Sequence, residues 1–409
     1  MTPATRQIVF INTAHTITHY SLLILPTAVL AMTRPGGPFG EAYGPILALA
    51  TGMFVLYGLL SLPQGWLERH LGRKTLMTAF FLGTAAGLIG AGLAQSSWML
   101  ATMLAIAGAF TAIYHPIGTT MLVEAAGDKP GKSIGVNGVF GNLGVALAPV
   151  ITAFLAVRFG WRAAFIAPGM FCLAIGLLWM RTPLVHGARH GTARPFPPIP
   201  APLVRRALVV LLLIATSSGL VFNAFTLLLP KLLEDRLAGS ASLLPLVGAA
   251  AFLVTLCGAL TQFTVGRLID RNTLKRVFLP VSLVLAPAMA GLSVAQGWTV
   301  LPLAALVAAS IFGQVTVNET MAARYISPEM RARIYSIRFF VGFLGAAASA
   351  PLVAALFERT GSLVAVTLLL AGFSVVTLAC ALFFPNRKEE LRPELWAAAH
   401  PASVPVAAE

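Results

Sequence analysis

The sequence predicts an all-α membrane protein with twelve transmembrane helices in two pseudo-symmetric six-helix bundles. Three observations support this fold class. The chain is 57% hydrophobic and only 10% charged, apolar runs recur along its 409 residues, and two similar basic loops lie about 200 residues apart. Soluble domains carry about 25% charged residues, so this composition excludes a water-exposed globular surface.

The apolar runs are long enough to cross a bilayer as helices. About 18 residues or more, at 1.5 Å per residue, span a hydrocarbon core about 30 Å thick. Several runs contain Gly and Pro, which membrane helices tolerate because neighbouring helices satisfy the freed backbone groups. The expected spans are 7–32, 42–63, 75–95, 98–124, 133–157, 161–181, 205–230, 242–265, 276–296, 298–325, 333–357 and 361–384.

Composition divides the chain into two halves and two polar segments. Residues 183–204 hold six prolines among histidines and arginines, a pattern typical of an exposed linker. We therefore expect bundles over 1–182 and 205–385, joined by a linker over 183–204. Residues 386–409 are rich in Ala, Pro and Glu and are expected to form a disordered tail.

The net charge of +14 is distributed unevenly over the predicted loops. If the N-terminus and the two repeated loops share one side, that side holds all but six of the 28 Lys and Arg residues. This is the positive-inside bias. Both termini and the linker are therefore expected on the cytoplasmic side of a bacterial-type inner (plasma) membrane. No segment has the pattern of a folded basic domain, so we expect no nucleic-acid partner. The six Lys and Arg residues expected on the opposite side of the membrane are Arg34, Arg158, Arg162, Lys231, Arg236 and Arg359.

The two basic loops follow the second apolar run of each half. The first covers residues 65–74 and the second 266–276, and together they resemble the loop motif of the major facilitator superfamily. The first departs from the family pattern because Arg69 stands where the usual acid would be, with Glu68 one position earlier. The matching residues are Gly65, Leu67, Gly72, Arg73 and Lys74 in the first loop, and Gly266, Leu268, Asp270 and Arg271 in the second.

The resemblance covers residues 7–385 and implies secondary active transport of a small solute by alternating access, with no cofactor. It also implies that the basic loops pair with acids at nearby helix ends and hold an inner gate. Glu124 is placed to pair with Arg73 or Arg69, and Arg338 with Glu319 or the loops. The alternative is that these charges only anchor the helices at the membrane interface.

Histidines form the most unusual pattern in the first half. Asn12, His15 and His19 are spaced by three and four residues and so share one face of the first helix. On the fourth helix, Thr111, His115 and Thr119 also share a face.

The resemblance places both of these helices at the central cavity, and His15 and His115 have similar depths. Three interpretations remain open: proton carriers, ligands of a transition metal, or residues that only hydrogen-bond between helices.

The second half contributes a smaller polar set. Asn318 and Glu319 lie in the tenth predicted helix and Asn223 in the seventh. A carboxylate inside a membrane helix suggests function, here proton coupling, or a structural pair with Arg324 or Arg338. Asn223 is either a solute contact or a bond between helices.

The glycine-rich fifth run and the stretch 114–118 resemble proton-coupled drug exporters of the fosmidomycin-resistance type. We therefore expect a monomer that exports a small solute in exchange for protons. The alternatives are import of a transition metal such as copper, or of a vitamin or metabolite. A membrane-embedded enzyme is disfavoured because Ser217 and Ser218 have no identifiable base.

Overall fold

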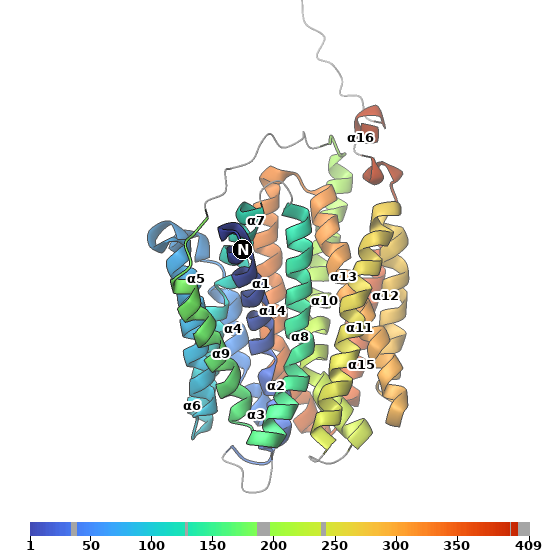
Figure 1. Ribbon diagram of the computed structural model, residues 1–409. Helices are drawn as coiled ribbons and strands as arrows, with labels where there is room; N and C mark the ends of the chain where they lie inside the picture. The colour runs from blue at the N-terminus through green and yellow to red at the C-terminus, as the bar shows by residue number, and fades with distance from the viewer. Residues whose placement is uncertain (34–38, 127–129, 186–196, 239–242, 393, 400–409) are drawn as a thin grey trace, which may run out of the picture.

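The computed structural model describes residues 1–33, 39–126, 130–185, 197–238, 243–392 and 394–399. Long helices run side by side in one bundle, and the N-terminus and α16 lie at the same end (Figure 1). We call this the terminal end and the opposite one the far end.

The first half begins with a capped helix, because Thr2 accepts a hydrogen bond from the Thr5 amide and Pro3 opens the first turn. Its elements are α1 (Pro3–Leu22), α2 (Ile24–Met32), α3 (Tyr43–Ala48), α4 (Thr51–Leu59), α5 (Gln64–Gly92), α6 (Ser97–Thr111), η1 (Tyr114–Gly118), α7 (Thr119–Ala126), α8 (Pro130–Phe159) and α9 (Ala163–Met180).

The second half begins directly after prolines of the expected linker, and its first helix already includes residues 201–204. Its elements are α10 (Ala201–Leu233), η2 (Glu234–Ala238), α11 (Leu244–Arg271), α12 (Leu274–Gly291), η4 (Gly297–Thr299), α13 (Val300–Tyr325), α14 (Pro328–Thr360), α15 (Val364–Phe383), η5 (Lys388–Leu391) and α16 (Glu394–Ala399).

The predicted all-α fold is confirmed. Among the described residues, eleven helices are long and apolar enough to cross a membrane. The remaining predicted span, 42–63, is divided into α3 and α4. At the division, the amides of Leu49 and Ala50 bond three residues back, to Ile46 and Leu47, so the helix tightens and is interrupted.

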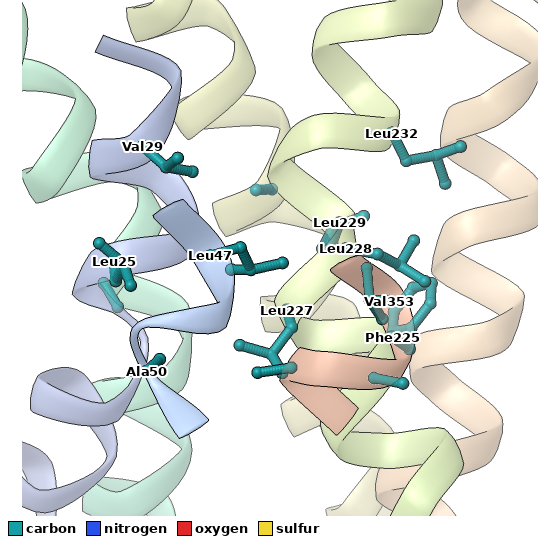
Figure 2. Close-up of a cluster of buried hydrophobic side chains, with 14 of the residues drawn as sticks. Leu25, Val29, Leu47, Ala50, Phe225, Leu227, Leu228, Leu229, Leu232 and Val353 are labelled. Carbon is teal, nitrogen blue, oxygen red and sulfur yellow. The ribbon is translucent and has the colours of Figure 1, made fainter. Parts of the chain in front are cut away.

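Side chains from both halves share one apolar core. Leu25 and Leu47 of the first half and Phe225, Leu228 and Val353 of the second belong to one buried cluster. Figure 2 shows how these side chains converge from α2, α3, α10 and α14. Close van der Waals packing of these side chains therefore holds the two halves together in this region.

One polar contact also crosses between the halves at the far end. The Glu358 carboxylate of α14 accepts a hydrogen bond from the Gly44 amide of α3 at 2.9 Å. The rings of Tyr43 and Phe357 pack edge to face beside it, with centroids 5.3 Å apart. The far end is therefore closed by contacts between the halves.

The chain after residue 385 differs from the prediction of a disordered tail. Glu390 accepts hydrogen bonds from the Leu274 amide and, at 2.6 Å, from the Tyr325 hydroxyl. Trp396 is 2% exposed and belongs to the core cluster that contains Tyr325 and Phe384. The described residues of 386–399 thus pack on the second half, because an acid and an indole find buried partners there. Residues 400–409 lie outside the described residues.

Candidate functional site

Two helical elements of the first half bring three histidines together. His15 and His19 lie one turn apart on α1, and His115 lies in η1, a single wide π-helical turn. Pro116 has no backbone N–H, so one α-helical hydrogen bond is missing here. Such turns are rare and often occur at functional sites.

The three imidazole rings contact one another. Nε2 of His19 lies 3.1 Å from Nε2 of His15. The ring centroid of His115 is 5.3 Å from that of His15 and 5.5 Å from that of His19. One nitrogen from each ring can be chosen so that all three lie within 4.8 Å of one another. We call these residues the histidine cluster.

The protonation pattern of His15 follows from its neighbours. Its Nδ1 lies 2.7 Å from the backbone oxygen of Asn137, which can only accept, so Nδ1 carries the hydrogen. In the neutral ring, Nε2 then holds a lone pair. His19 donates its Nε2 hydrogen to that lone pair. His19 thus donates to His15, and His15 donates to the Asn137 carbonyl of α8.

Asn137 also organises the polar groups around the cluster, a role that the sequence analysis missed. Its side-chain amide donates to Oδ1 of Asn12 at 2.9 Å and to the Tyr114 hydroxyl at 2.8 Å. The Tyr114 ring stacks on His15 with centroids 4.8 Å apart. Asn12 is therefore brought to the cluster through Asn137. A polar residue near the start of the glycine-rich fifth span was the available signal.

Three of the expected site residues bond to their own helix instead. The Thr111 hydroxyl donates to the Ala107 oxygen at 2.9 Å, and that of Thr119 donates to the His115 oxygen. The Asn223 amide donates to the Gly219 oxygen at 2.8 Å. These bonds satisfy the polar groups locally, as Ser, Thr and Asn side chains commonly do inside helices.

In the second half, α13 carries an acid beside an amide. Glu319 accepts from Arg338 of α14 at 2.7 Å, and its side chain is 46% exposed. Arg324, the other expected partner, donates to the Ile269 oxygen at 2.9 Å. Asn318 is buried, and its Oδ1 has no hydrogen-bond partner among the residues that the structure describes. Arg338 is thus placed beside Glu319, one of its two predicted partners.

The first basic loop forms an ion-pair network within its own half. Gly72 has φ +74°, a left-handed conformation that favours glycine, so the chain turns here between two spans. Arg73 then pairs with both Glu68 and Glu124. Arg69 is exposed, and Glu124 pairs with Arg73, one of the two partners predicted for it. Glu68 therefore pairs with Arg73 of the loop, although it lies one position before the acid of the family pattern.

The second basic loop differs from the first. Gly266 lies in the last turns of α11, where a side chain would meet open space. Asp270 and Arg271 are exposed, and neither has an ion pair among the described side chains. The two loops are therefore similar in sequence but not in their ion pairs.

Comparisons with known proteins agree with the fold. The model of the Major Facilitator Superfamily matches residues 20–260 and 237–407. The chain is 23% identical over 243 residues to the multidrug resistance protein MdtG of Serratia proteamaculans, covering 57% of this chain and 59% of that one. It is 31% identical over 96 residues to the uncharacterized MFS-type transporter YfnC of Bacillus subtilis, covering 24% of each. The matches thus span under two thirds of both relatives.

Two solved structures are similar in fold at low sequence identity. The inward-open xylose transporter XylE from E. coli has a TM-score of 0.71 at 13% identity, with 96% of this chain and 100% of that one covered. The nucleoside transporter NupG has a TM-score of 0.72 at 12% identity, with 93% and 100% covered. Together with the family match over most of its length, this fold shows that the chain belongs to the Major Facilitator Superfamily.

Proposed function

We propose that the protein is a secondary active transporter that exports a small organic solute across a bacterial inner membrane in exchange for protons. The observation that carries this proposal is Glu319. It lies about 9 Å inside an apolar helix, yet its side chain is 46% exposed and paired with Arg338. A charged pair at this depth is stable only where water or protein polar groups solvate it, as in a transport cleft.

The contacts between the halves support a transport cleft that would be reached from the terminal end. The far end is closed by the bond from the Gly44 amide to Glu358 and by the shared apolar core. The positive charge of the loops supports a cytoplasmic location for the terminal end. In this state the solute would therefore enter from the cytoplasm.

Glu319 can couple proton movement to the conformational change. While the cleft is open, water solvates the carboxylate and it pairs with Arg338. For exchange, the solute and the proton must occupy the site in alternate half-cycles. The site would turn outward with solute bound, and it would turn back with a proton on Glu319 in place of the Arg338 ion pair and the solute. That proton would be released to the cytoplasm as the next solute binds, so the solute and the proton oppose each other's binding, as linkage requires.

The remaining polar residues are proposed as solute contacts and as supports of the gate. Asn318 offers a buried acceptor, and Asn223 and the histidine cluster provide further polar groups at membrane depth. Arg73, with Glu68 and Glu124, would hold α5 and α7 in one arrangement as the halves move. Export is supported by the likeness to a protein named for multidrug resistance.

Proteoliposomes test the coupling. Purified protein would be screened with a panel of labelled solutes, with and without an imposed proton gradient. We expect the gradient to drive transport in the wild type at least tenfold faster than in Glu319→Gln. Solute exchange without a gradient should persist in the variant, because exchange needs no net proton movement. Glu41→Gln, at an exposed residue of the far end, is the matched control and should behave as wild type. Equal gradient dependence in Glu319→Gln and wild type would reject this role.

A further inference from the structure

We infer that the histidine cluster binds a divalent transition-metal ion, for which Zn²⁺ is the probe. This site goes beyond the proposed function, since neither solute export nor proton exchange at Glu319 requires a metal. The ligands would be one ring nitrogen each from His15, His19 and His115.

The spacing of the nitrogen atoms fits coordination of one ion. Zn²⁺ binds imidazole nitrogen at about 2.0–2.1 Å in a tetrahedral arrangement, which puts two ligand atoms about 3.3 Å apart. The Nε2 atoms of His15 and His19 are 3.1 Å apart. The donor atoms all lie within 4.8 Å of one another, so side-chain movement of about 1.5 Å or less brings all three to that spacing.

The backbone oxygen of Asn137 orients the His15 ring in the way that hydrogen-bond acceptors orient histidines that bind metals. Metal-binding histidines usually donate their second ring N–H to a carbonyl or carboxylate, which fixes the tautomer and aims the lone pair at the ion. The Asn137 oxygen does this at 2.7 Å from Nδ1 of His15, leaving the Nε2 lone pair directed at His19. An ion would replace the Nε2 hydrogen of His19 between the two rings. The neutral His19 ring would then carry its hydrogen on Nδ1.

Packing of α8 keeps room for this arrangement. A methyl group on Gly141 would lie 2.5–2.9 Å from the His15 ring, so only glycine lets the ring occupy its present position. On another side Tyr114 stacks on His15, and the Tyr57 ring lies 6.3 Å from that of His115. The cluster is thus enclosed by aromatic rings and backbone.

The donor set selects the class of ion. Neutral imidazoles suit Zn²⁺, Cu²⁺ and Ni²⁺, whereas Mg²⁺ and Ca²⁺ prefer oxygen ligands. Three protein ligands leave a fourth position open for water or a donor atom of a solute. All three ligands belong to the first half, so a bound ion would move with that half.

Calorimetric titration of the purified full-length protein, without a histidine tag, tests the site. We expect one Zn²⁺ ion per chain and no heat of binding with Mg²⁺. His19→Gln and His115→Gln should each weaken Zn²⁺ binding at least tenfold. The chain has four other histidines, so the variant His70→Gln/His186→Gln/His190→Gln/His400→Gln is the control and should bind as wild type.

A second measurement covers the case in which a cluster variant does not fold. Co²⁺ added to the wild-type protein should give the strong visible absorption of a tetrahedral site, and equimolar Zn²⁺ should remove it. Absence of stoichiometric Zn²⁺ binding by the wild type would overturn the inference. So would loss of binding in the control together with its retention in His19→Gln. Both experiments measure binding alone, so their outcome is independent of transport.

Discussion

Among individual residues of the first half, Asn137 connects three polar neighbours. Its side chain bonds Asn12 and Tyr114, and its backbone oxygen bonds His15. Inside a membrane protein, polar groups that lose their partner find no water to replace it. The amide therefore stabilises the arrangement of the cluster as well as the packing of α1 against α8.

We predict that Asn137→Ala lowers the free energy of unfolding by about 1–3 kcal/mol, since two buried groups lose their hydrogen bonds. Thermal unfolding of the purified protein in detergent would measure the change. Asn272→Ala is the control, because among the described residues that side chain bonds the Leu268 oxygen alone, at an exposed position, and it should have little effect. An equal loss in both variants would contradict the special place of Asn137.

The sequence was sufficient to predict the histidines of the site but not their neighbours. Spacings of three and four put His15 and His19 on one face, and equal depth predicted that His115 would meet them. The three side chains do contact one another. Asn137 was missed because its role depends on how closely α8 approaches α1. That distance is set by packing between residues more than 120 positions apart, which helical periodicity does not report.

Pairs of helices approach closely where glycines face a neighbouring backbone. A methyl group on Gly144 of α8 would lie 2.4 Å from the Thr16 oxygen of α1, whereas one on Gly138 would meet nothing within 4 Å. Backbone cannot yield as a flexible side chain does. The contact between α1 and α8 therefore requires glycine at residue 144 but not at residue 138.

The two glycines give a prediction with opposite signs. Gly144→Ala should destabilise the protein by about 1–3 kcal/mol, because the helices must separate. Gly138→Ala should be neutral or stabilise by up to about 1 kcal/mol, because alanine loses less backbone entropy in a helix. Thermal unfolding of the two variants measures both. Equal destabilisation would show that the close approach is not the cause.

The packed segment 386–399 gives a pH-dependent prediction. Burial raises the pKa of Glu390, more than its hydrogen bonds and Arg324 lower it. The folded protein thus binds this proton more tightly than the unfolded chain. Its contribution to stability is greatest below the ordinary glutamate pKa of about 4.3 and is lost as the pH rises through the raised value. The unfolding temperature of wild type minus that of Glu390→Gln should therefore fall with rising pH over that range. A difference that stays constant would contradict this.

Element positions were predictable where hydrophobicity alone decides them. Eleven of the twelve predicted spans correspond to long apolar helices. The division of α3 from α4 and the packing of residues 386–399 were not foreseen. In the first case the amides of Leu49 and Ala50 bond the carbonyl three residues back instead of four. This change lies within a continuous apolar run, so hydrophobicity does not reveal it. In the second case Glu390 is polar and Trp396 is an isolated aromatic residue in the sequence. Their structural roles depend on partners far away in the chain.

At the scale of the whole molecule, contacts at the far end join the two halves. Besides the bond between Gly44 and Glu358, Lys231 is paired with Glu234 and Asp235 at 2.9 and 2.7 Å, and it lies over the Tyr43 ring. Opening the far end must break the bond from Glu358, which crosses between the halves. We therefore expect Glu358→Ala to shift the population toward a state open at that end.

Spin labels can measure this shift. Trp98 and Trp298 are 81% and 66% exposed and lie at corresponding places of the two halves, so Trp98→Cys/Trp298→Cys would report the far end. The background would lack Cys172, Cys257 and Cys380. Double electron–electron resonance should show a longer distance in Glu358→Ala than in the parent. Glu41→Ala, at an exposed far-end residue, should leave the distance unchanged. An unchanged distance in Glu358→Ala would show that this bond does not hold the far end closed.

The most direct test of the account compares both ends in the same protein. A second label pair, Leu71→Cys/Leu268→Cys, would report the terminal end through its two exposed loops. Distances would be measured at neutral and acidic pH, with and without a transported solute. Alternating access predicts that the distance at the terminal end shortens as the distance at the far end lengthens. Distances that stay fixed, or that change in the same direction at both ends, would contradict it.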